Sequence, residues 1–209
     1  MTKSESIRVL IVDDHPVVRF GLTAIIQSQS DMVVVAQAEN GKKAVELYRR
    51  EKPDVGLIDL RLPEMSGVDA IRAIVSEHDK ARLIVLTTYE GDEDIYRALE
   101  AGAKGYLIKG MSHEILIEAI RRVHSGLRFV PESVAKHLKE RLPLSDLSPR
   151  ENDVLALIVK GNSNKEIAAE LGITEGTVKC HVNAILARLG VSDRTQAAVA
   201  ALQRGIVHL

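Results

Sequence analysis

The 209-residue sequence lacks several features that would place it in a specialised class of protein. It contains one cysteine, Cys180, which excludes an intramolecular disulfide and fits a reducing compartment. No run of roughly 18 or more apolar residues is present, which argues against a membrane-spanning helix, and the first residues lack the apolar core of a secretory signal. We therefore expect a cytoplasmic protein that has no membrane partner.

An excess of charge of either sign is also lacking. The formal net charge is −1, with 45% hydrophobic and 27% charged residues, which is the composition of an ordinary soluble protein. Any basic surface must therefore come from the placement of Lys and Arg rather than from their total. Internal repeats and low-complexity tracts are lacking too, and the length suits one large domain or two small ones.

Residues 7 to about 125 alternate short apolar runs with longer amphipathic stretches. The runs show little polar alternation, which is typical of strands buried on both faces. The expected strands are 7–12, 32–37, 54–59, 82–88 and 105–108, and the expected helices are 17–27, 42–51, 68–76, 92–101 and 112–124. Five such units predict an α/β fold, a doubly wound five-stranded parallel sheet with helices on both sides.

The pattern changes after residue 126. Residues 127–147 carry prolines on both sides of an amphipathic stretch, and we interpret them as a linker with a short helix at 131–141. Four helical stretches follow at 148–161, 163–172, 174–190 and 192–205, and two of them begin with the Ser-x-x-Glu pattern of a capping box. The expected domains are thus an α/β domain at 1–126, a linker at 127–147 and a smaller all-α four-helix domain at 148–209.

Acidic residues follow two of the expected strands. Asp13 and Asp14 come directly after the first strand, and Asp59 ends the third. In a doubly wound sheet, ligands bind beyond the carboxyl ends of the strands, so the three carboxylates could converge there. They are either solvated loop caps or ligands of a cation that offsets their repulsion, and an all-oxygen set favours Mg²⁺.

The other strand ends carry a hydroxyl and an ammonium group. Thr87 ends the fourth strand, and Lys109 follows the fifth. Each residue alone has an ordinary explanation, as a β-branched strand residue or a surface lysine. Together with the carboxylates they are the groups needed to stabilise a transferred phosphoryl group. Asp59 is the expected nucleophile, because an aspartate can form an acyl phosphate.

The expected helix at 175–189 has an unusual outer face. Its core stripe is Val178, Val182, Ile185 and Leu189. Cys180, Asn183 and Ala187 point away from this stripe, with Lys179 on the flank, so the outer face is small and polar. Such a face fits the major groove of DNA, and the three residues before the helix suit a helix-turn-helix. The alternative is a helical bundle in which this face is simply solvated. The charge of residues 144–209, with seven basic and seven acidic residues, does not distinguish this alternative from DNA binding.

The motifs of both halves resemble those of a known family. "VDDH", "DLRLPEMSG", "LTT" and "GYLIKG" are similar to the motifs of a response-regulator receiver domain. "LSPRE", "KEIA" and "TVKCHV" resemble a LuxR-type helix-turn-helix module. The whole chain is similar to the NarL/FixJ family of two-component response regulators, which implies a flavodoxin-like receiver followed by a helix-turn-helix DNA-binding domain.

This resemblance implies roles for particular residues of the receiver. Mg²⁺ would be held by Asp13, Asp14, Asp59 and the Arg61 carbonyl, and Asp59 would accept the phosphoryl group. The groups implied to contact or sense it are Thr87, Lys109 and the switch residue Tyr106. Two departures are that Gly110 replaces a common proline and Leu62 a common methionine. Because Arg61 and Tyr89 are bulky, we expect them to obstruct the attacking water and to prolong the life of the phosphoryl-aspartate.

The resemblance also implies roles for the C-terminal helices. Lys179, Cys180 and Asn183 match base-facing positions, and Asn183 departs from the basic residue common there. Residues that match or lie near phosphate-contacting positions are Asn164, Lys165, Thr174, Thr177, His181 and Arg194. His181 could instead hydrogen-bond within the domain. The small residues Ala197, Ala200 and Ala201 fit either a dimer seam or the core.

The expected function is that of a response regulator rather than an enzyme. A sensor histidine kinase would phosphorylate Asp59, and the phosphorylated homodimer would bind double-stranded promoter DNA, with RNA polymerase as a further partner. One alternative is a regulator that needs no phosphorylation and uses the receiver as a dimerisation scaffold. Another is a phosphatase, which would need a second aspartate two residues after the nucleophile, and Arg61 occupies that position.

Overall fold

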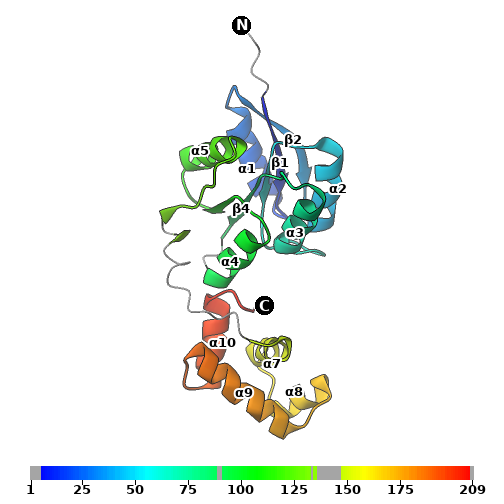
Figure 1. The fold of residues 1–209 in the computed structure, drawn as a ribbon, viewed down its shortest axis with the longest axis vertical. Coiled ribbons are helices and arrows are strands. Elements are labelled where there is room, and N and C mark those ends of the chain that lie inside the picture. The colour runs from blue at the N-terminus through cyan, green and yellow to red at the C-terminus, as the bar shows by residue number, and fades with distance from the viewer. Residues whose placement is uncertain (1–5, 89–90, 133, 136–146, 208–209) are drawn as a thin grey trace. The chain divides into compact units, whose positions relative to one another are not determined.

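The structure is a computed structural model that describes residues 6–88, 91–132, 134–135 and 147–207. These residues form two compact units, an N-terminal α/β unit and a C-terminal helical unit, each described by itself below (Figure 1). In the part of the chain that is described, no helix is long and apolar enough to cross a membrane. The expected linker helix at 131–141 lies largely outside the described residues.

The N-terminal unit is built around a five-stranded parallel sheet. Its strands are β1 Ile7–Val12, β2 Met32–Ala38, β3 Val55–Ile58, β4 Leu83–Thr87 and β5 Gly105–Ile108, in the order β2-β1-β3-β4-β5. β3 and β4 are buried along their whole length, as continuous apolar runs predict. β2 is different, because it is an edge strand and Val33 is exposed. The prediction of two buried faces was therefore wrong for this strand.

Five helices cover the two faces of this sheet. They are α1 Pro16–Gln27, α2 Gly41–Glu51, α3 Gly67–Glu77, α4 Asp92–Glu100 and α5 His113–His124. α1 and α5 lie on one side of the sheet, and α2 and α3 lie on the other (Figure 1). On the first side, residues of α1 and α5 form one core with strand residues such as Val9 and Leu107. The doubly wound α/β fold expected from the sequence is confirmed.

The C-terminal unit contains α7 Pro149–Val159, α8 Asn164–Leu171, α9 Glu175–Leu189 and α10 Arg194–Gln203. Both expected capping boxes are present. Ser148 caps α7 with Glu151 as the reciprocal partner, and Ser163 caps α8 with Glu166. The four helices enclose one apolar core, to which α9 contributes Val178, Ile185 and Leu189.

Candidate functional site

The strand register brings Asp13 and Asp59 to the same edge of the sheet. Val12 is paired with Ile58 in the ladder between β1 and β3, so the residues that follow them leave neighbouring strands at the same level. The Asp59 amide donates to the Val12 carbonyl at 2.9 Å and extends this alignment by one residue. Both carboxylates are almost fully buried, with side-chain exposures of 2% and 4%.

Lys109 places its ammonium group between these two carboxylates. Its Nζ lies 2.6 Å from Asp13 Oδ2 and 2.5 Å from Asp59 Oδ2. Its backbone amide donates to the carbonyl of Thr87 at 2.7 Å, which ties the end of β5 to the end of β4. Burial acts to lower the pKa of Lys109, but the hydrogen bonds and charges of Asp13 and Asp59 outweigh it and raise the pKa above its usual value. The lysine is therefore charged at neutral pH.

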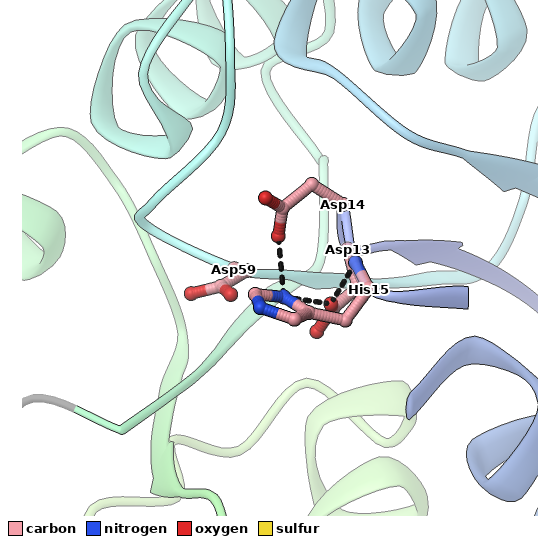
Figure 2. A group of neighbouring side chains, drawn as sticks. All are labelled: Asp13, Asp14, His15 and Asp59. Carbon is pink, nitrogen blue, oxygen red and sulfur yellow. Dashed lines mark hydrogen bonds and ion pairs between the residues drawn. The ribbon is translucent and has the colours of Figure 1, made fainter. Parts of the chain in front are cut away.

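Asp14 and His15 complete the acidic pocket on its more exposed side. Figure 2 shows the His15 ring between the carboxylates of Asp14 and Asp13, with Asp59 nearby. The Nδ1 atom lies 2.6 Å from Asp14 Oδ1 and 3.3 Å from Asp13 Oδ1. The backbone amide of His15 also donates to Asp13 Oδ1 at 2.9 Å. One possible ligand atom from each of the four residues lies within 4.8 Å of the others.

The backbone at the start of α3 packs closely against the backbone of Asp59. A side chain at Gly67 would place its Cβ 2.0 Å from the Asp59 carbonyl oxygen, so the start of α3 can approach this segment only with glycine there. The Gly67 amide donates to the Leu60 carbonyl at 3.0 Å. On the other side of the aspartate, the Arg61 amide donates to Asp59 Oδ1 at 3.3 Å. These contacts hold the carboxylate in a defined position.

Two other residues with expected roles in the receiver, Thr87 and Tyr106, are buried on β4 and β5. Thr87 is fully buried at the end of β4. Tyr106 lies on β5, in register with Val85, and its ring is also fully buried, so the aromatic side chain already points inward. No cis peptide bond occurs among the described residues. Tyr89 lies outside the described residues.

The donor set of the pocket fits Mg²⁺. Two buried carboxylates and one partly exposed carboxylate supply oxygen ligands, and the open side next to Asp14, with 37% of its side chain exposed, leaves room for water. Mg²⁺ prefers this arrangement, in which a few carboxylates bind the ion and several waters stay on it. Lys109 contacts the Oδ2 atoms of Asp13 and Asp59, which leaves their Oδ1 atoms, each of which accepts one backbone amide, as the oxygens available to an ion.

A second candidate site is the outer face of α9 in the helical unit. Lys179, Cys180, Asn183 and Ala187 are all exposed, and Val178 and Ile185 on the opposite side are fully buried. Three residues, ending at the N-cap Thr174, separate α8 from α9, as expected for a helix-turn-helix. The predicted division of α9 into a core stripe and a small polar face is therefore confirmed.

The residues expected to contact phosphates are not all equally accessible. Lys165, Thr174 and Thr177 are exposed, and the Thr174 hydroxyl accepts from the Thr177 amide at 3.1 Å as the helix cap. Arg194 is half-buried and donates to the Asn162 carbonyl at 2.6 Å and to Asn164 Oδ1 at 3.4 Å. Asn164 and His181 are half-buried as well. Arg194 therefore has a structural role in holding the turn before α8.

The small residues of α10 lie in the core of the helical unit. Ala197 and Ala201 are fully buried in the cluster formed with α7 and α9, and Ala200 is nearly so. Of the two interpretations left open by the sequence, the structure favours the core role. The larger apolar residues Val199 and Leu202 are the exposed ones on this helix.

Comparison with known proteins identifies the family. Residues 9–121 match the response regulator receiver domain, and residues 145–201 match the LuxR family of bacterial regulatory proteins. The chain is a response regulator. It belongs to the two-component regulators of the NarL type, in which a receiver is joined to a LuxR-type DNA-binding domain that controls transcription. Receiver domains bind Mg²⁺ in an acidic pocket, which here contains Asp13, Asp14 and Asp59.

Two curated relatives match the response regulator over almost its whole length. It is 40% identical over 216 residues to the transcriptional regulatory protein LnrK of Bacillus subtilis (strain 168), which covers 96% of this chain and 98% of LnrK. It is also 40% identical over 208 residues to the response regulator VraR of Staphylococcus aureus (strain NCTC 8325), which covers 97% of this chain and 100% of VraR.

Among the solved structures similar to the response regulator are complexes of RcsB with DNA. RcsB of Salmonella enterica serovar Typhimurium, bound to promoter P1flhDC in the presence of the phosphomimetic BeF3⁻, is 25% identical with a TM-score of 0.71. The similarity covers 95% of the response regulator and 99% of RcsB. Another structure holds two RcsB dimers on two parallel DNAs, with 25% identity and a TM-score of 0.69.

Sequence reasoning missed two residues of the receiver pocket. His15 was read only as part of a motif, although its position beside two aspartates is visible in the sequence. Arg19 was missed because it lies one turn inside α1, where its Nη1 donates to the Asp13 carbonyl at 2.5 Å. No local sequence pattern predicts that contact, because it depends on the orientation of α1 relative to the end of β1.

Proposed function

We propose that this response regulator is switched by phosphorylation of Asp59. The observation that carries the proposal is the convergence of Asp13, Asp59 and Lys109, from three strand ends, within 2.6 Å of the lysine nitrogen. Burying two carboxylates is costly, and this cost is offset only while a cation lies between them. Such a pocket is suited to receive a phosphoryl group, whose negative charge the lysine and a bound ion can share.

The transfer itself needs one nucleophile and one leaving group. A carboxylate oxygen of Asp59 attacks the phosphorus of a phosphohistidine on the sensor kinase, and a P–O bond forms as the P–N bond breaks. The electron pair of the broken bond returns to the imidazole nitrogen. With acetyl phosphate as donor, the same attack releases acetate.

The residues around Asp59 would position the acceptor and the new group. Mg²⁺ held by Asp13, Asp14, Asp59 and the Arg61 carbonyl would supply positive charge to the phosphoryl oxygens. Lys109, already charged and tied to Thr87 through its backbone, would pair with another oxygen. The Thr87 hydroxyl, at the end of the neighbouring strand, would donate to a third.

Phosphorylation would then shift a pre-existing equilibrium. Engagement of Thr87 by the phosphoryl group would hold Tyr106 in the inward position that its ring already occupies here, and would so favour a receiver surface that dimerises. A change from 1:99 to 99:1 takes about 5.5 kcal/mol of differential stabilisation, which phosphoryl contacts and a dimer interface can share. The DNA complexes of RcsB, including dimers on DNA, support a phosphorylated homodimer that binds promoter DNA. RNA polymerase would be the further partner of the DNA-bound dimer.

The proposal is tested by comparing the wild-type chain with Asp59→Asn. Both proteins are treated with acetyl phosphate and Mg²⁺, and intact mass, oligomeric state by light scattering and binding to promoter fragments are measured. We expect the wild type to gain the mass of one phosphoryl group, to dimerise and to bind DNA more tightly, and the variant to do none of these. If Asp59→Asn dimerises and binds DNA as well as the treated wild type, the regulator does not depend on phosphorylation.

Arg61 is expected to set the lifetime of the phosphoryl group. Its backbone amide donates to Asp59 Oδ1 at 3.3 Å, and we expect its bulky side chain to hinder the water that hydrolyses the acyl phosphate. We expect Arg61→Asn to speed dephosphorylation about fivefold, which corresponds to about 1 kcal/mol of barrier. The rate is followed as loss of phosphoryl mass after the donor is removed, with Arg72→Asn on the exposed face of α3 as the control. An unchanged rate would show that Arg61 does not shield the phosphoryl group.

Lys179 is expected to contact DNA directly. It is exposed on the outer face of α9, where a lysine can reach a guanine or a phosphate. We expect Lys179→Ala to weaken binding to the operator by about 1–3 kcal/mol and to lower its salt dependence. The control is Lys160→Ala, which removes an equally exposed charge at the end of α7. Equal losses in the two variants would mean that Lys179 acts only through net charge.

A further inference from the structure

His15 is the residue of the acidic pocket to which no role has yet been assigned. It occupies the N-cap position of α1, where Ser, Thr, Asp or Asn would cap the helix with a side-chain oxygen. Its side chain makes no capping hydrogen bond. The ring is directed instead at the carboxylates of Asp14 and Asp13 (Figure 2). The position is therefore used to bring an imidazole nitrogen to the pocket rather than to stabilise the helix.

The distances around His15 resemble those within a metal coordination shell. Ligand atoms at about 2.1 Å from an octahedral ion lie about 3.0 Å apart when adjacent and about 4.2 Å apart when opposite. The Nδ1 atom is 2.6 Å from Asp14 Oδ1 and 3.3 Å from Asp13 Oδ1, and the whole set lies within 4.8 Å. Because opposite ligands lie about 4.2 Å apart, side-chain movements of about 0.6 Å would bring all four atoms onto one ion.

We propose that His15 supplies a nitrogen ligand to the metal site and so widens its preference from Mg²⁺ to first-row transition ions. Three carboxylates alone favour hard ions such as Mg²⁺. An imidazole nitrogen suits the later divalent ions, whose affinity for nitrogen ligands rises from Mn²⁺ through Co²⁺ to Cu²⁺. The inference rests on the proposed metal site and names the class of ion that can occupy it.

His15 could bind a metal ion in the pocket without a change in the backbone around it. The His15 amide donates to Asp13 Oδ1 at 2.9 Å, and Arg19 holds the Asp13 carbonyl. The ring is 66% exposed, so it can rotate towards the ion without disturbing the core. Lys109 lies on the opposite side of Asp13, at Oδ2, and does not compete for the oxygen that faces His15.

The test compares the affinities for Co²⁺ and Mg²⁺ by calorimetry, in the full chain and without any phosphoryl donor. Only the Co²⁺ binding that Mg²⁺ displaces is counted, which removes ions held by other histidines or by Cys180. In His15→Ala and His15→Asn we expect the ratio of Co²⁺ to Mg²⁺ affinity to fall at least about tenfold. His113→Ala, which removes an exposed ring elsewhere in the receiver, is expected to leave the ratio unchanged.

A second readout observes the ring itself. With ¹⁵N-labelled histidine, Co²⁺ should shift or broaden the His15 ring signals in proportion to occupancy, and Mg²⁺ in excess should reverse the change. If Mg²⁺ and Co²⁺ compete for one site but the affinity ratio is the same in His15→Ala, the ring only hydrogen-bonds Asp14 and the inference fails. If neither ion competes with the other, the proposed metal site fails with it.

Discussion

Replacing Lys109 by methionine is expected to lower the free energy of unfolding of the receiver by about 3–5 kcal/mol in metal-free buffer. The substitution keeps an unbranched side chain as far as Cε but removes the charged nitrogen between Asp13 and Asp59, whose side chains are 2% and 4% exposed. Two buried carboxylates would then face each other without this cation. Millimolar Mg²⁺ should recover part of the loss, because the ion can take the place of the ammonium charge.

The receiver can be followed separately in the intact protein. The chain has no tryptophan, and its four tyrosines all precede residue 107, so tyrosine fluorescence during urea unfolding reports on the receiver. The double variant Lys109→Met/Asp59→Asn is the control, because it removes one of the repelling charges and should be more stable than the single variant. A double variant as unstable as Lys109→Met would show that lost packing, not charge, is responsible.

Glu151→Ala is expected to destabilise the helical domain by about 2–3 kcal/mol. Glu151 Oε2 accepts from the Ser148 amide at 2.6 Å and pairs with Arg188 at 2.9 Å, and the glutamate side chain is only 6% exposed. The variant would lose the α7 capping box and the link from α7 to α9. Hydrogen exchange of the α7 and α9 amides in the full chain measures the loss, since it reports the free energy of opening.

The same carboxylate makes the helical domain sensitive to acid. Burial acts to raise the pKa of Glu151, but hydrogen bonds from Ser148 and Arg188 outweigh it, and the net pKa lies below its usual value of 4.5. Its contribution is therefore present above pH 4.5 and is lost as the pH falls through the lowered pKa. Glu166→Ala is the matched control, because Glu166 forms the same box on α8 but is exposed. Equal effects of the two substitutions would contradict a special role for the Arg188 link.

The fold was predictable because the two halves of the sequence differ in their hydrophobic patterns: short apolar runs alternate with amphipathic stretches up to about residue 125, and only helical patterns follow residue 147. Short apolar runs such as β3 can bury both faces only inside a layered sheet, and the four helical stretches after residue 147 are marked instead by the capping residues at their starts. The prediction was wrong for β2, where Val33 is as apolar as residues of central strands and its exposure follows from strand order. Strand order depends on contacts between distant segments, which local patterns do not contain.

The pocket was predictable in its composition but not in its contacts. Parallel strands of one sheet have their carboxyl ends at one edge, so Asp13, Asp59 and Thr87 were expected at that edge once the sheet was inferred, and the strand order β1-β3-β4 makes them neighbours. The position of the Lys109 nitrogen between two carboxylates depends on rotamers and register, which sequence alone does not provide. The role of Gly67 was hidden for the same reason, because it depends on how closely α3 approaches Asp59.

The proposed switch depends on Asp59 carrying the phosphoryl group, and chemical trapping tests this most directly. After treatment with acetyl phosphate and Mg²⁺, borohydride reduces an aspartyl phosphate to homoserine, and tandem mass spectrometry locates the reduced residue. We predict homoserine at position 59 and at no other aspartate, with none formed when the donor is omitted. Homoserine at another position, or none in protein that has gained phosphoryl mass, would contradict the account.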